Sequence, residues 1–175
     1  HQGVHPDIEF PEVFDTDRIG ESSLEDAMPW DKIRAAMYPK SQQIAPLMPD
    51  LKTRHQQRVV NDPDFVYLRA LALKNREENG RTFLSLNENV RVAEKAGEDQ
   101  WRLDLENALR KAKGKEPVAS LEDLETLSTE EKEALEDPAN DAMLRESGYI
   151  LVDLIGLSRQ VALVDHEAAP GVAIH

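Results

Sequence analysis

Apolar residues recur at helical spacing along most of the chain, and prolines and glycines divide this pattern into segments. Several segments start at a proline or at a Ser, Asn or Asp, residues that favour the beginning of a helix. The predicted helices cover residues 22–28, 31–37, 49–60, 63–79, 87–113 and 128–135. A last helix starts at Asp137-Pro138; it is apolar over more than one face, so we expect it to be the most buried element.

The first residues of the chain have a different pattern. His5-Pro6-Asp7 is a turn signal, and residues 8–14 are short extended pieces in which Pro11 bars a long strand. A single strand is not stable without a partner sheet. We therefore expect residues 1–14 to hold an edge strand that leaves another domain.

These patterns predict a mainly α fold class, a multi-helix module with a short extended N-terminal segment. The predicted divisions are 1–21 for the end of another domain with its linker, 22–164 for the helical domain, and 165–175 for a loose tail.

Composition limits the partners of this module. The chain has 175 residues with 34 acidic and 21 basic side chains, which gives a net charge of -13. A surface this acidic repels nucleic acid and anionic membrane surfaces, so we expect neither as a partner. No apolar run approaches the ~20 residues that span a bilayer. The absence of cysteine excludes disulfides, thiolate metal sites and cysteine nucleophiles.

The remaining residue types offer no recognisable catalytic motif. There is no Gly-x-Ser-x-Gly, no Gly-rich phosphate loop and no pair of carboxyl groups that the pattern selects. No histidine has a second His or a carboxylate at a recognised metal spacing, and His55 is predicted to be solvated on a polar helix face. Trp30 and Trp101 are predicted to be core residues rather than partner anchors. We therefore predict no catalytic, cofactor-binding or metal-ligating residues and no cofactor.

Five stretches, taken together and in order, resemble the C-terminal region of periplasmic tail-specific proteases, which are bacterial C-terminal processing peptidases. The first is similar to the Gly-Val-x-Pro-Asp-Ile segment that closes the protease core of that family, and the third to its Ala-Leu-Pro-Trp-Asp-x-Ile signature. The stretches are Gly3–Ile8, Ile19–Ser22, Ala27–Ile33, Asn61–Phe65, and Leu84–Asn87 with Val90-Arg91. Beyond Gly114 the similarity thins to an acidic linker and a final helix.

The resemblance implies a helical C-terminal domain of a Ser–Lys endopeptidase that carries an inserted PDZ domain. Such enzymes degrade or trim periplasmic proteins by reading their apolar C-termini. Their serine nucleophile and lysine base both precede the segment that resembles Gly3–Ile8. No residue of this chain maps onto that dyad, so we expect the chain by itself to have no peptidase activity.

The resemblance also suggests partners and a location. The expected partners are the protease core and PDZ domain of the same protein, protein substrates, a helical adaptor lipoprotein and a second copy of the chain. The expected location is the periplasm, and the expected role is to pack on the core and to shape substrate access or dock the adaptor. The alternative is a free-standing acidic helical adaptor, an interaction protein with no protease attached.

Overall fold

The computed structural model describes residues 6–14, 20, 23–26, 37, 44–126, 128 and 137–168, without the side chains of 125 and 162–168. The helices are η2 (Ala45–Leu47), α2 (Met48–Val59), α3 (Pro63–Asn79), α4 (Glu88–Ala112), α5 (Glu122–Glu125), η3 (Pro138–Asn140) and α7 (Ala142–Ala168). No strand occurs among these described residues. The predicted mainly α fold class is confirmed.

Aspartate and asparagine side chains begin the three long helices. The Asp62 carboxylate accepts hydrogen bonds from the backbone N–H groups of Asp64 and Phe65, and Pro63 occupies the first position of α3. Asn87 caps α4 in the same way, and Asp141 caps α7. Each cap satisfies backbone donors that have no partner inside the helix. The sequence pattern therefore predicted the starts of α3 and α4 correctly.

The last helix differs from its predicted bounds at both ends. Asp137-Pro138 starts only the single 3-10 turn η3, because the backbone leaves helical geometry at Asp141 before α7 begins at Ala142. At its C-terminal end α7 continues to Ala168, so residues 165–168 belong to the helix and not to the tail. Residues 169–175 lie outside the described residues, and so do the predicted helices over 31–37 and 128–135 except for Met37 and Ser128. Of the predicted helix over 22–28, residues 23–26 are described, and they form no α-helix.

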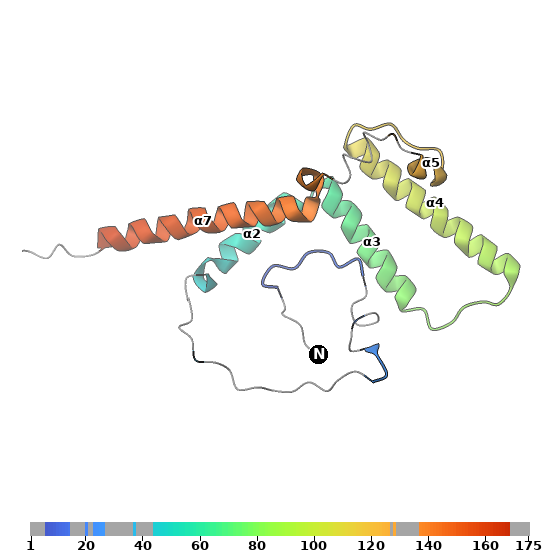
Figure 1. Cartoon of the computed structure of the whole chain (residues 1–175), viewed down its shortest axis with the longest axis horizontal. Helices are drawn as coiled ribbons and strands as arrows, with labels where there is room; N and C mark the ends of the chain where they lie inside the picture. Colours follow the sequence, from blue (N-terminus) through green and yellow to red (C-terminus); the bar gives the residue numbers. More distant parts are fainter. Residues whose placement is uncertain are drawn as a thin grey trace, which may run out of the picture.

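Two helix pairs make up the arrangement (Figure 1). α7 lies along α2, and α3 lies beside α4, with the short α5 next to the C-terminal end of α4. The two pairs meet where α2 ends, α3 begins and α7 begins. The apolar core consists of two small clusters. Leu47 packs with Leu51 and Leu157 in the first, and Val59 packs with Phe65 and Ala142 in the second.

The N-terminal segment packs against the helices instead of forming a strand. Ile8 packs on the first core cluster, Phe10 packs on the second, and the Asn75 side chain donates a 2.8 Å hydrogen bond to the Val13 carbonyl. Residues 8–14 have no regular secondary structure, with bends at Ile8 and Phe14, so the edge strand predicted for them is absent from the described residues. The side chains of Ile8 and Phe10 are half-buried against the two core clusters, whereas Phe14 is 73 % exposed.

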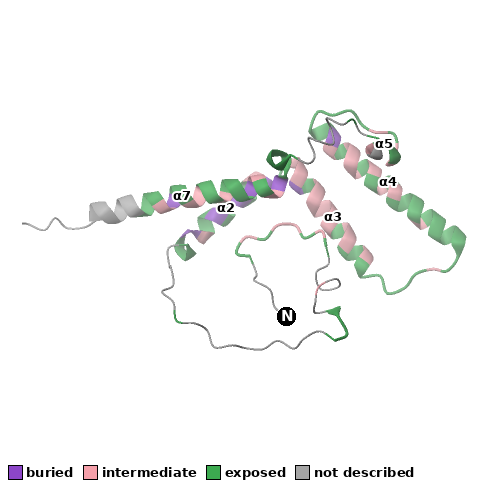
Figure 2. Ribbon diagram, in the orientation of Figure 1, coloured by how far each residue is buried: buried purple, intermediate pink, exposed green. Residues whose placement is uncertain are grey.

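The prediction that the last helix is the most buried element is wrong. Figure 2 shows buried positions of α7 only on the side that faces α2, with exposed positions on the outer side. Leu144, Leu151, Val152 and Ile155 are all exposed. A single partner helix covers only one face of α7, although its sequence is apolar over more than one.

Replacing Phe65 by alanine should destabilise the chain by about 3–5 kcal/mol, because this side chain is 2 % exposed and joins the helix pairs. The neighbouring Val66, 47 % exposed on the same helix, provides the control, and Val66→Ala should change stability by less than about 0.5 kcal/mol. Urea unfolding followed by far-UV circular dichroism measures both. Equal effects of the two substitutions would contradict the core described above.

Candidate functional site

A histidine interrupts the buried stripe of α2. Leu47, Leu51, His55 and Val59 are spaced four residues apart and are all buried. The prediction that His55 is solvated is therefore wrong. The other residues of this stripe are apolar because it faces α7, and His55 is tolerated there only because it has a polar partner on that helix.

That partner belongs to the matching stripe of α7. Glu146 lies one turn after the buried Ala142 and is 4 % exposed, and Asp153 follows two turns later on the same face. A carboxylate at this depth is costly to desolvate unless several donors reach it. α2 supplies these donors from residues three and four positions apart.

The Glu146 carboxylate is bound from two sides. Arg58 donates through Nε to Oε1 and Oε2 at 3.1 and 3.0 Å and through Nη2 to Oε1 at 2.8 Å. His55 Nδ1 lies 2.9 Å from Oε1, and because an ionised carboxylate only accepts hydrogen bonds, His55 is the donor. The planar guanidinium suits a carboxylate better than an ammonium group does.

Arg58 also connects Glu146 to the second carboxylate. Its Nη1 donates to Asp153 Oδ2 at 2.6 Å, and Arg54 Nη1 donates to Asp153 Oδ1 at 2.9 Å. The hydrogen bonds with Glu146 raise the pKa of the Arg58 guanidinium, so it stays charged. Burial opposes ionisation of Asp153, but the two arginines outweigh it and lower the pKa of this carboxyl group. We call these five residues, His55, Glu146, Arg58, Asp153 and Arg54, the ionic clasp.

Aromatic rings close the clasp on the side of the N-terminal segment. The Phe10 ring stacks on the His55 imidazole with centroids 5.4 Å apart and an interplanar angle of 22°. Phe65 meets both rings edge-on, at 5.5 Å from Phe10 and 6.1 Å from His55. The imidazole therefore bonds through its edge to Glu146 and packs through its face on Phe10.

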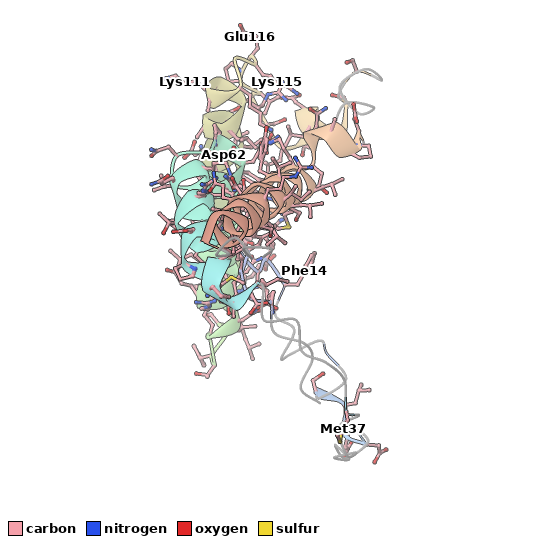
Figure 3. All side chains as sticks on the ribbon, turned by 90° about the vertical axis from the view of Figure 1, so that its left-hand side faces the viewer. Phe14, Met37, Asp62, Lys111, Lys115 and Glu116 are labelled. Atoms are coloured by element: carbon pink, nitrogen blue, oxygen red, sulfur yellow. The ribbon has the colours of Figure 1, made fainter. Side chains whose placement is uncertain are left out.

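A second ionic cluster joins the two helix pairs. Arg145 of α7 donates to Asp62 at 3.3 Å and to Asp64 at 3.2 Å, and Lys113 after α4 lies 2.5 Å from Asp64. Figure 3 shows Asp62 beside α7, at the junction, and Lys111 and Lys115 around the C-terminal end of α4. Asp62 thus caps α3 with one oxygen and binds α7 with the other.

The ionic clasp holds α2 and α7 together through side-chain hydrogen bonds. A His–carboxylate pair can activate a hydroxyl nucleophile, but no hydroxyl among the described residues is hydrogen-bonded to the His55 ring. Within the same ranges, no three His, Asp or Glu side chains gather as a metal site, and no helix is long and apolar enough to cross a membrane. The geometry of the clasp is that of a structural contact.

Trp101 contributes to a neighbouring contact rather than to the clasp. It is half-buried on α4, and the ammonium of Lys74 on α3 lies 5.7 Å from the centroid of its ring. This cation–π contact supports the α3–α4 pair. Trp30 lies outside the described residues.

Sequence reasoning missed the clasp, although one signal was present. His55 occupies the position where the repeat of Leu47, Leu51 and Val59 calls for an apolar residue. A polar residue inside such a repeat indicates a buried polar partner. The sequence gives no comparable signal that Glu146 is this partner, because 91 residues separate the two.

Glu146→Gln should destabilise the chain by about 1–3 kcal/mol, because it removes the buried charge that Arg58 and His55 bind and leaves Asp153 as the partner of Arg58. Urea unfolding at pH 7 measures this loss. Glu78→Gln is the control, since Glu78 binds Lys74 and Arg81 at the surface, and it should leave stability nearly unchanged. A loss in Glu146→Gln no larger than in the control would show that the clasp is dispensable.

The lowered pKa of Asp153 predicts a pH-dependent difference between the wild-type chain and Asp153→Asn. A carboxyl group whose folded-state pKa is below its ordinary value of 3.8 stabilises the fold above that value and loses this contribution as pH falls further. The wild-type chain should be more stable than Asp153→Asn near neutral pH, and the difference should shrink below 3.8. Unfolding curves between neutral and acid pH measure it, with the exposed Glu77→Gln as the control. A difference that grows on acidification would contradict the assignment.

Comparison with known proteins gives the family. Residues 14–156 match the family model described as the C-terminal domain of tail specific protease (DUF3340). The chain is 32 % identical over 157 residues to the tail-specific protease of Haemophilus influenzae. This alignment covers 88 % of the chain but 21 % of that relative, so the chain spans about a fifth of the length of the relative. The chain belongs to the family of C-terminal domains of tail-specific proteases.

Proposed function

We propose that the chain is a non-catalytic accessory domain that packs against the catalytic part of a tail-specific protease in the bacterial periplasm. The family match over residues 14–156 is the observation that carries this proposal. The ionic clasp supports it, because Glu146 and Asp153 are bound by arginines and His55 is directed to Glu146. These contacts use the clasp residues to hold α2 against α7.

The activity that the domain serves is the cleavage of proteins recognised by their apolar C-termini. In this proposal the helices shape the path by which substrate reaches the catalytic part or dock a helical adaptor. The angle between the α2–α7 pair and the α3–α4 pair in Figure 1 suits such a role. The two helix pairs meet at one junction, enclose two small core clusters, and present long exposed faces to their surroundings.

The runner-up function is a free-standing acidic adaptor, which the net charge of -13 and the exposed apolar side chains favour. The gene that encodes this chain separates the two functions. A catalytic serine and lysine encoded upstream of His1 support the accessory domain. A start codon and signal peptide directly before His1 support the adaptor and overturn the proposal.

The biochemical test compares three proteins: the full polypeptide, the 175-residue chain, and the polypeptide without residues 44–168. The full polypeptide should cleave an unfolded protein with an apolar C-terminus, and the 175-residue chain should not. Removal of residues 44–168 should lower the thermal stability of the catalytic part or its rate of cleavage. Cleavage by the 175-residue chain alone, or a truncated polypeptide with unchanged stability and rate, would overturn the proposal.

A further inference from the structure

Residues 8–13 lie across both core clusters, although they belong to no helix or strand. Ile8 packs on the first cluster, which α2 and α7 share, and Phe10 packs on the second. The Val13 carbonyl accepts a 2.8 Å hydrogen bond from the Asn75 side chain of α3. We call residues 8–13 the strap. It connects the α2–α7 pair to α3 at three points.

The middle of the strap covers the ionic clasp. The Phe10 ring stacks on the His55 imidazole at 5.4 Å, and the same imidazole donates its 2.9 Å hydrogen bond to Glu146. His55 is 8 % exposed and Glu146 is 4 % exposed. A hydrogen bond to a carboxylate is stronger where water is excluded. The Phe10 ring therefore strengthens the contact between α2 and α7 by keeping water from the imidazole.

The strap is easier to release than the helices on which it lies. Its isoleucine, phenylalanine and valine are only half-buried, and its two glutamates are exposed. Segments with few buried contacts and a solvent-exposed backbone open at a lower free energy than packed helices do. The strap can therefore leave its place in a local opening that leaves the helices folded.

We infer that the strap is a conformational device that controls how firmly α7 is held on α2. While the strap is seated, the hydrogen bond between His55 and Glu146 is shielded from water. When the strap leaves, water reaches the imidazole and competes for the carboxylate, so α7 is held mainly by Arg58 and Arg54. The device lies within the 175-residue chain and does not depend on the proposed function.

Histidine labelling of the 175-residue chain measures how often the strap opens. Diethyl pyrocarbonate acylates an accessible imidazole nitrogen, and peptide mass mapping separates His55 from the other histidines. Phe10→Ala removes two aromatic pairs, so His55 should react about tenfold faster than in the wild-type chain. Phe14→Ala is the matched control, because Phe14 follows the strap and is 73 % exposed, and it should leave the rate unchanged. Equal rates in the two variants would overturn the inference.

A second substitution loosens the strap without touching the imidazole. Asn75→Ala removes the hydrogen bond to Val13 at the other end of the strap. Loss of this bond should speed the labelling of His55 by about two- to tenfold. The variant keeps every apolar contact of the strap, so it also provides the test if Phe10→Ala fails to fold. An unchanged rate would show that residues 8–13 do not open as one unit, which contradicts the inference.

Hydrogen exchange followed by mass spectrometry tests the control of α7. In Phe10→Ala and Asn75→Ala the amides of residues 142–157 should exchange faster than in the wild-type chain. Residues 95–109 of α4 should keep their wild-type rate, because α4 takes no part in the clasp or in either core cluster. Unchanged exchange over 142–157 would show that the strap covers His55 without controlling α7. Equally faster exchange in both ranges would show that residues 8–13 are an ordinary part of the core, and either result overturns the inference.

Discussion

The structure depends on how a buried carboxylate is neutralised between α2 and α7. Glu146 is 4 % exposed, and Arg58 and His55 bind it from one helix. Desolvating these groups costs several kcal/mol per ion, which the hydrogen bonds and ion pairs within the clasp must offset. The hydrogen-bond geometry admits one register of α7 on α2, because a shift by one residue would move Glu146 away from the guanidinium.

At the junction, charged side chains likewise connect α3 and the end of α4 to α7. Asp62 both caps α3 and binds Arg145, and Asp64 binds Arg145 and Lys113. Two acidic residues around one proline thus connect a helix start to the beginning of α7 and the end of α4. Apolar packing there is limited to Val59, Phe65, Ala142 and the ring of Phe10. Ionic contacts orient the helices, and this small cluster supplies the apolar burial at the same place.

Much apolar surface of α7 remains exposed. The two core clusters contain few residues, while large apolar side chains on α7 stay in contact with water. An isolated two-layer domain buries the apolar stripe of each helix within itself. Here the inner stripe of α7 is buried and the outer one is open, which agrees with membership in a family of C-terminal domains.

The sequence by itself determined the mainly α class and the starts of α3 and α4, because capping residues and helical periodicity are local. It also carried the family resemblance through short motifs. Only the tertiary structure decided that His55 is buried, that Glu146 is its partner and that Phe10 covers it, since these residues are far apart in the chain. Periodicity likewise marked α7 as apolar on more than one side but could not tell which side is covered. Burial is a property of the neighbours that a helix meets, and those are set by long-range contacts.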